Sequence, residues 1–238
     1  MISALVDERI SRECERGLTK AGFRPIKLPR SRALAEAIAS HPDTLLFYHE
    51  GRIITSADYC DEAAYVFSDI RELHPDIKIS FTADSFGKKY PHDVPFNSIV
   101  LKNKLFAKAD TLSEAIKSYA AEQCLCIVNT RQGYPACATL ALNSNEVITA
   151  DKGLAEIYKS EGIAVTLIES GDISLPPYDY GFIGGASGVF DGRVYFFGDY
   201  KKHKSASLIE SAILRAGLTP ISLSDEPLSD LGGIIFIK

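Results

Sequence analysis

The sequence lacks several features that would assign a chain to a broad class at once. No stretch of about 18 apolar residues occurs, so no membrane-spanning helix is expected. The opening stretch MISALVDERISRE has neither a cationic start nor a long apolar run, so no signal peptide is expected. The net charge is −5, and the only basic cluster, YKKHK at 200–204, is too small to predict nucleic-acid binding.

Cysteine and histidine are also sparse and show no ligand-like spacing. The five cysteines form no Cys-x-x-Cys pair, and they are Cys14, Cys60, Cys124, Cys126 and Cys137. An odd number without pairing is typical of a reducing cytoplasm and predicts no disulfide framework. The histidines, His41 among them, show no metal-ligand spacing with acids or cysteines, so neither a metal site nor a cofactor is expected.

What the sequence does contain is a repeated unit. The composition, 46% hydrophobic and 24% charged over 238 residues, is that of an ordinary globular chain. Five apolar strands end in Asp, at Asp7, Asp58, Asp110, Asp151 and Asp199. Helices are expected after them, over roughly 8–21, 59–73, 111–122, 152–161 and 204–216. A carboxylate at such a place can accept first-turn N–H groups, which predicts a helix cap at each Asp.

Each helix leads into a second apolar strand, and in four units a hairpin follows. The hairpin turns are expected at HEGR, LKNK, NSNE and FDGR, between 49 and 193. Asp191-Gly192 is the strongest turn signal, because glycine accepts the positive φ that tight hairpin turns need. Gly22, Gly162 and Gly217 precede second strands and suit the position just after a helix.

The fifth unit is split between the two ends of the chain. DLGGIIFIK at 230–238 supplies a hairpin strand without a later partner, and MISALVD at 1–7 is a strand without an earlier one. If these pair, residues 1–238 form a single α/β domain, a five-bladed pseudo-fivefold propeller whose ring is closed by the terminal strands. A doubly wound α/β sheet is the alternative, but it requires crossovers where the hairpin turns occur.

The glycine-rich stretch DYGFIGGASGVFDGRVYFFGD at 179–199 superficially resembles a phosphate-binding loop. Such a loop precedes a helix and carries a Lys after its last glycine, whereas this stretch runs into a hairpin strand and has no such Lys. The glycines are therefore expected within the first hairpin strand. They serve either close packing at the axis of the ring or exposure of N–H groups to a ligand.

Five such units, with a ring closed by both termini, resemble the pentein fold. That is the fold of arginine deiminases, dimethylarginine hydrolases and amidinotransferases, and of a ribosome anti-association factor that does no chemistry. YPHDVPFN, ITADKG and DYGFIGGASG resemble a small uncharacterised bacterial family of this fold. The resemblance implies a central cleft that takes a guanidino compound, with a nucleophilic Cys near the C-terminus and a His in the blade before it.

The chain departs from that catalytic pattern at both positions. Gly232-Gly233 is followed by Ile234, and no cysteine lies beyond Cys137. The stretch that corresponds to the family histidine is Gly184 to Ser187 and contains none. Without the thiolate, no covalent thiouronium intermediate can form by the family route.

Candidate site residues come from the loops that lead into the inner hairpin strands, where polar and aromatic groups gather. Cys137 and His92 are the candidate catalytic residues, as a thiol with Arg131 just upstream and as a general base. The candidate ligand-binding residues are Asp93, Asn97, Arg131, Tyr134, Tyr180, Gly184, Gly185 and Asp230. Asp93 can grip a guanidinium, or it can be a turn residue between Pro91 and Pro95. Cys137 can instead be a small buried strand residue, and His92 a surface one.

These residues lead to two functional hypotheses. The first is a cytoplasmic protein that binds a small polar or guanidino-like metabolite in a central cleft. If it is an enzyme, it is expected to be hydrolase-like or amidinotransferase-like with a rearranged site. The alternative is a non-catalytic scaffold that binds a protein partner. Neither hypothesis involves nucleic acid or a membrane.

Overall fold

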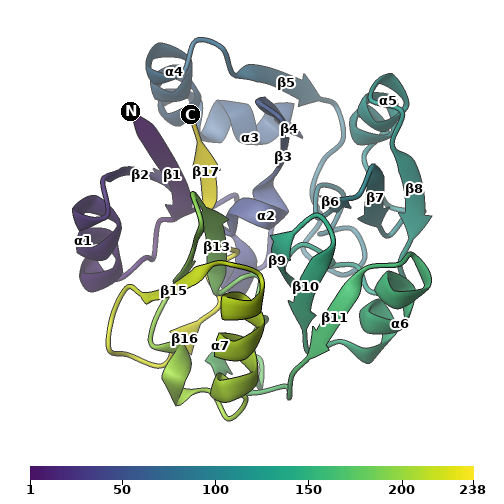
Figure 1. The fold of residues 1–238 in the computed structure, drawn as a ribbon. Helices are drawn as coiled ribbons and strands as arrows, with labels where there is room; N and C mark the ends of the chain where they lie inside the picture. Colours follow the sequence, from purple (N-terminus) through teal and green to yellow (C-terminus); the bar gives the residue numbers. More distant parts are fainter.

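Five three-stranded sheets follow one another along the chain in the computed structural model, which describes residues 1–238 (Figure 1). In each sheet an antiparallel pair is extended by a parallel third strand. The strands, sheet by sheet, are β17 (Ile235–Ile237), β1 (Ile2–Asp7) and β2 (Phe23–Leu28); β3 (Leu46–His49), β4 (Arg52–Ser56) and β5 (Lys78–Thr82); β6 (Ile99–Leu101), β7 (Lys104–Ala107) and β8 (Cys126–Asn129); β9 (Thr139–Asn143), β10 (Glu146–Thr149) and β11 (Ala164–Leu167); β13 (Ser187–Phe190), β14 (Arg193–Phe196) and β15 (Thr219–Ser222).

The helices connect the second and third strands of each sheet and lie around the outside of the molecule in Figure 1. They are α1 (Arg12–Lys20), α3 (Ala57–Glu62) with α4 (Ala64–Leu73), α5 (Glu114–Glu122), α6 (Lys152–Ser160) and α7 (Ala206–Arg215). Shorter elements are α2 (Pro42–Leu45), two 3-10 turns (Glu36–Ile38 and Tyr200–Lys202), and a parallel pair of β12 (Ile173–Ser174) with β16 (Leu228–Ser229). No helix is both long enough and apolar enough to cross a bilayer.

The two terminal strands pair as the sequence predicts. β17 runs antiparallel to β1, with Ser3 opposite Ile237 and Leu5 opposite Ile235. No sheet closes on itself, since each of these five has three strands. The architecture is therefore a mixed α/β fold of repeated units, and the antiparallel hairpins rule out the doubly wound parallel sheet.

The four predicted hairpin turns are confirmed. They connect β3 to β4, β6 to β7, β9 to β10 and β13 to β14. Asp191 and Gly192 have φ angles of 47° and 72°, the left-handed pair that a two-residue hairpin turn requires. Gly22, Gly162 and Gly217 also have positive φ after α1, α6 and α7, as a helix end of this kind requires.

The predicted Asp caps are only partly confirmed. Asp151 accepts the N–H of Leu154 at 2.8 Å and caps α6, and Asp199 accepts the N–H of Lys201 at the 3-10 turn. The helices α1 and α5 begin later than predicted, because the hydroxyls of Ser11 and Ser113 accept their first-turn N–H groups instead.

The predicted position of the glycine pair in a strand is wrong. β13 begins at Ser187, so Gly184 and Gly185 lie in the turn that precedes it. Gly232 and Gly233 occupy the corresponding bend before β17. Both turns lead into strands that lie near the middle of Figure 1, and β13 lies against β9 and β17. These turns therefore meet where the units converge.

His203 provides a test of how burial couples folding to pH. The ring is 2% exposed, and its Nδ1 accepts the N–H of Ser205 at 2.9 Å, just before α7. Burial lowers the pKa of His203, so the unfolded chain binds this proton at a higher pH than the folded one does. The stability contributed by the neutral ring is fully present above the unfolded pKa of about 6.5 and is lost as pH falls through the folded pKa.

We expect the free energy of unfolding to fall between about pH 7.5 and pH 5, with up to about 1.4 kcal/mol per pH unit coming from this ring. His203→Asn keeps an acceptor for the Ser205 N–H without a titrating group, so its curve should be flatter. Urea unfolding at a series of pH values measures both slopes. Equal slopes for the two proteins would contradict the assignment.

Candidate functional site

A cavity of about 590 Å³ opens where the loops before the inner strands converge. Four loops line it: those that precede β3, β6, β9 and β13. The lining residues are Ile38, His41, Thr44, Lys88, Lys89, Tyr90, Asp93, Tyr134, Cys137, Leu175, Tyr178, Asp179, Tyr180 and Phe182. The volume is in the range of small-molecule sites, and polar groups from several units converge on one space.

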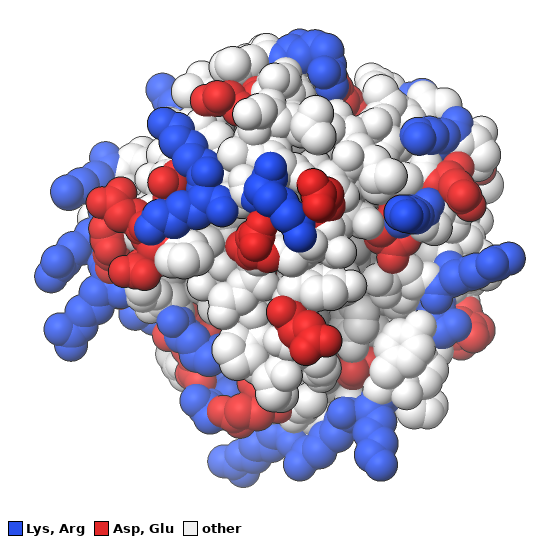
Figure 2. Space-filling model, turned by 90° about the horizontal axis from the view of Figure 1, so that it is seen from below, with Lys and Arg blue, Asp and Glu red and all other residues white.

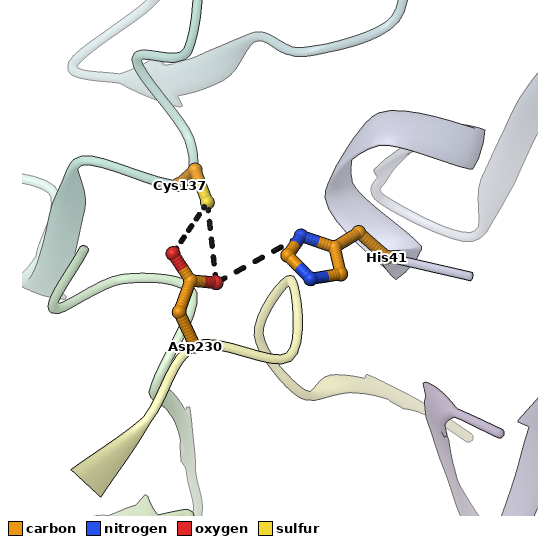
Figure 3. Close-up of side chains that lie close together, drawn as sticks. All are labelled: His41, Cys137 and Asp230. Carbon is orange, nitrogen blue, oxygen red and sulfur yellow. Dashed lines mark hydrogen bonds and ion pairs between the residues drawn. The ribbon is translucent and has the colours of Figure 1, made fainter. Parts of the chain in front are cut away.

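Three buried side chains from different units meet at this cavity (Figure 3). The Sγ of Cys137 lies 3.5 Å from both carboxylate oxygens of Asp230, and Nδ1 of His41 lies 3.8 Å from Oδ1 of Asp230. Each is at most 4% exposed. The pKa of the Cys137 thiol is raised well above its usual value by burial, and then by the charges of Asp230 and Asp43. The protonated thiol therefore donates to Asp230, and it is not a ready nucleophile.

Backbone groups fix Asp230 in place. Its Oδ2 accepts the N–H of Phe182 at 2.8 Å, and its Oδ1 accepts that of Gly232 at 3.1 Å. A Cβ on Gly185 would lie 1.9 Å from Oδ1 of Asp230 and 2.8 Å from Sγ of Cys137. A Cβ on Gly181 would lie 2.4 Å from that of Asp230. The glycine-rich stretch thus makes room for a side-chain cluster. This supports close packing as the role of these glycines, rather than exposure of their N–H groups to a ligand.

His41 is fully buried beside a second carboxylate. Its Nε2 lies 3.8 Å from Oδ2 of Asp7, and neither ring nitrogen has a hydrogen-bond partner. Asp7 is held by Arg9, whose guanidinium donates to both of its oxygens, and by the hydroxyl of Ser40 at 2.8 Å. Gly232, with φ of 69°, packs against His41, where a Cβ would approach that of His41 to 2.3 Å.

Asp43, at the start of α2, adds a further buried acid near the cluster. Its Oδ2 has no hydrogen-bond partner. Burial raises the pKa of Asp43 to about 6, with His41 opposing the shift and Asp230 adding to it. Buried acidic groups therefore gather behind the cavity, away from water.

Asp93 and Tyr134 form a second polar pair on the cavity wall. The Tyr134 hydroxyl donates to Oδ2 of Asp93 at 2.7 Å, whereas Oδ1 of this 4%-exposed carboxylate has no partner. The pKa of Tyr134 is raised by burial and then by Asp93, so the phenol stays a donor. Asn97 lies behind this wall, where its Oδ1 accepts the N–H of Ala136 at 2.9 Å.

The structure brings some of the predicted site residues together and separates others. Cys137, Asp93, Tyr134 and Tyr180 line the cavity, and Asp230 and Gly185 lie directly behind Cys137. Gly184 lines a separate, smaller hollow. Arg131 is exposed and lines a hollow with Gln132 and Asp151, whereas His92 is exposed in another with Asp84 and Asp110. Neither Arg131 nor His92 lines the cavity that contains Cys137.

Sequence reasoning missed His41, Asp43 and the second role of Asp7. His41 lies just before α2 and Asp43 within it, in the connection that leads into β3. That connection occupies the same place in its unit as the loops from which the other candidates came. This position in the repeat was the signal from which His41 and Asp43 could have been predicted as site residues. His41, Cys137 and Asp230 are also the residues that could hold a metal ion, because their ligand atoms all lie within 4.8 Å of one another.

Charges of both signs are interspersed on the face shown in Figure 2, with long Lys and Arg side chains extending from its rim. No continuous basic surface is visible on this face. A nucleic-acid site there would require one.

The sequence profile of a family of unknown function, DUF6873, matches residues 5–235. No curated protein sequence matches the chain. Several solved structures do, including a dimethylarginine dimethylaminohydrolase from Pseudomonas aeruginosa in complex with citrulline, with 11% identity, a TM-score of 0.55, and coverage of 94% of this chain and 91% of that one.

Two further structures are similar to the same extent. For the inosamine-phosphate amidinotransferase from Streptomyces griseus the TM-score is 0.56 at 13% identity, covering 95% of this chain and 79% of that one. For an agmatine deiminase from C. jejuni it is 0.55 at 8% identity, covering 94% and 87%. At these identities the likeness shows the fold alone, and it confirms the predicted resemblance to the pentein fold.

The closeness of Gly185 to Asp230 gives a direct test of the cluster. Gly185→Ala places a methyl group where Oδ1 of Asp230 now lies, so the carboxylate must move. Overpacking of this kind costs roughly 1–3 kcal/mol of stability.

Gly153→Ala is the matched control, because that glycine lies in α6 and the nearest atom to a new Cβ is a side-chain oxygen at 3.2 Å. It should be neutral, or stabilising by up to about 1 kcal/mol. Urea unfolding compares both with the wild type, and an unchanged Gly185→Ala would show that the cluster is not tightly packed.

Proposed function

The chain belongs to the family of unknown function DUF6873, and from its fold and cavity we propose that it binds a small guanidino-type cation. One observation carries the proposal: Asp93 is buried in the cavity wall and its Oδ1 has no hydrogen-bond partner. A buried carboxylate is strongly unfavourable unless it is paired. A ligand that brings a positive charge and planar N–H donors to Oδ1 would supply the missing partner.

Tyr134 prepares Asp93 for that role. Its hydroxyl donates to Oδ2, which stabilises the ionised carboxylate and restricts its rotation. The Oδ2 oxygen keeps acceptor capacity beyond the one bond from Tyr134, so a guanidinium can still contact both oxygens. A single ammonium group would use Oδ1 but gain less from the planar geometry.

Aromatic side chains at the cavity favour the same kind of ligand. Tyr90, Tyr178 and Tyr180 line it and are 50%, 54% and 43% exposed. The flat face of a guanidinium stacks on such rings, and its charge is attracted to them. Lys88 and Lys89 also line the cavity and are exposed. They would pair with a carboxylate at the other end of an arginine-like ligand.

The chemistry available to Cys137 favours binding over covalent catalysis. The thiol is protonated and donates to Asp230, and Asp230 lies between it and His41 (Figure 3). A nucleophilic pair would instead need the imidazole next to the sulfur. If the bound ligand is turned over, the reaction would resemble hydrolysis or amidine transfer, with the residues around Cys137 and Asp93 in place of the family nucleophile.

We also propose how the five units are arranged. The five units would form one five-bladed propeller over residues 1–238, with the cavity on its axis. It is supported by the common strand order of the five sheets and by the pairing of β1 with β17. A cytoplasmic location is supported by five cysteines that are all free thiols.

Thermal unfolding in the presence of arginine, agmatine, guanidinoacetate and citrulline tests the binding proposal. A ligand at about a hundred times its Kd adds about 2.7 kcal/mol, which for a chain of this size raises Tm by roughly 5 °C or more. We expect a shift with one of the guanidinium compounds and none with citrulline, whose ureido group carries no positive charge. If Lys88 and Lys89 pair with a carboxylate, arginine should stabilise more than agmatine does.

Asp93→Asn should abolish the shift, because it removes the charge and keeps the shape. Asp110→Asn is the matched control, since Asp110 is exposed, lies outside the cavity and pairs with Lys108. It should respond like the wild type. The proposal is wrong if no guanidinium compound stabilises the folded wild type, or if Asp93→Asn responds equally.

A further inference from the structure

The cluster behind the cavity contains a thiol, an imidazole and a carboxylate, which together form a ligand set for a transition metal. We propose that the protein binds one zinc-type divalent ion through Nδ1 of His41, Sγ of Cys137 and Oδ1 of Asp230, with a fourth position facing the cavity. The proposal does not depend on a guanidino ligand. It rests on the distances within the cluster, the unpartnered imidazole and the surroundings of the three side chains.

The observed spacing is close to that of a tetrahedral site. Bonds of about 2.3 Å to sulfur and about 2.0 Å to oxygen and nitrogen put sulfur and oxygen about 3.5 Å apart, and nitrogen and oxygen about 3.3 Å apart. The structure has 3.5 Å between Cys137 Sγ and Asp230 Oδ1, and 3.8 Å between His41 Nδ1 and the same oxygen. The three ligand atoms all lie within 4.8 Å. A shift of the imidazole toward the sulfur and the carboxylate would complete the geometry.

His41 points independently to a missing partner. It is 0% exposed, and neither of its ring nitrogens makes a hydrogen bond. Buried polar groups in native proteins are nearly always paired, so an imidazole with two free nitrogens calls for an explanation. A metal ion at Nδ1 would supply one partner, and the Nε2 proton then faces Asp7.

The surroundings hold the three side chains as outer-shell groups of metal sites do. The backbone N–H of Phe182 donates to Oδ2 of Asp230, and that of Gly232 donates to Oδ1, which lies 3.8 Å from the imidazole of His41. Asp7, on the far side of the imidazole, is fixed by Arg9 and Ser40. A carboxylate behind a ligating histidine orients the ring and raises its basicity.

The ligand types indicate which ion the site would take. Thiolate and imidazole favour zinc and similar ions, whereas magnesium and calcium prefer oxygen alone. When the sulfur–metal bond forms, the Cys137 thiol gives up its proton to solvent. The thiolate and the Asp230 carboxylate then balance the two charges of the ion. Because His41 and Cys137 both line the cavity, the fourth position is open to water or to a bound molecule, as it is in catalytic zinc sites.

Cobalt(II) titration of chelator-treated protein tests the proposal, because cobalt bound to a thiolate shows a sulfur-to-metal charge-transfer band. The full-length chain would carry Cys124→Ser and Cys126→Ser, since both thiols are exposed and close in sequence. We expect the protein to bind one equivalent of cobalt and to show visible absorption bands with the intensity typical of tetrahedral cobalt. One equivalent of zinc should displace the cobalt. In this parent, Cys137→Ser should remove the charge-transfer band. Asp230→Asn removes a charged ligand and should weaken binding by more than the roughly 10- to 100-fold that loss of an outer-shell group costs.

Matched controls separate ligand loss from general damage. Cys14→Ser changes another buried cysteine, and His203→Asn another buried histidine; both should keep the band and the affinity. Asp7→Asn should keep the band and weaken binding about 10- to 100-fold, as the loss of an outer-shell group does. Near-ultraviolet circular dichroism checks that each variant is folded.

The parent protein alone can overturn the proposal, so the outcome does not depend on the folding of any variant. Absence of a charge-transfer band in the folded parent at excess cobalt would exclude the site. A band that persists in folded Cys137→Ser would assign the metal to other thiols and would exclude it equally. X-ray absorption of the zinc-loaded parent should show one sulfur among nitrogen and oxygen neighbours, and a shell without sulfur would also overturn the proposal.

Discussion

The arrangement of the site depends on one buried carboxylate, that of Asp230. It is 2% exposed and accepts hydrogen bonds from the Phe182 and Gly232 backbones and from the Cys137 thiol. A buried anion without such donors would be strongly unfavourable, so the loops before β9, β13 and β17 must all reach this point. They can do so only where no side chain intervenes, which is why Gly185 lies against it. The cavity in front of Cys137 follows from that convergence.

The repeated unit was predictable because it is set by local backbone chemistry. Turns such as Asp191-Gly192 need positive φ wherever they occur, and a glycine after a helix has the same requirement. The apolar strands were recognised correctly, although only Asp7 is the last residue of its strand and Asp58 lies inside α3. The caps depended on competition among neighbours. Ser11 and Ser113 lie several residues further on and accept first-turn N–H groups, so the helices start there. Residue preference for the cap position alone does not decide which of two nearby polar residues caps the helix.

The site was predictable only as far as the repeat was applied to every unit. Cys137, Asp93, Tyr134 and Asp230 were found because loops before inner strands were expected to converge. The same reasoning applied to the loop before β3 would have included His41. That His41 lies next to Asp230 is a different matter, because the contact depends on how two sheets meet and on the space left by Gly232. No spacing along the chain expresses it, so the spacing of histidines, cysteines and acids predicted no such cluster.

The pairing of β1 with β17 affects the order in which the chain can fold during synthesis. β1 leaves the ribosome before strands β2 to β17 and can pair with β2 as soon as α1 has formed. Its other edge has no partner until residues 235–237 emerge. Throughout that interval a buried apolar strand keeps an open edge, the kind of edge on which nascent chains associate wrongly. The bend at Asp230 to Gly233 is made in the same late step. The central cluster can therefore assemble only after the strands of the other four units have been synthesised.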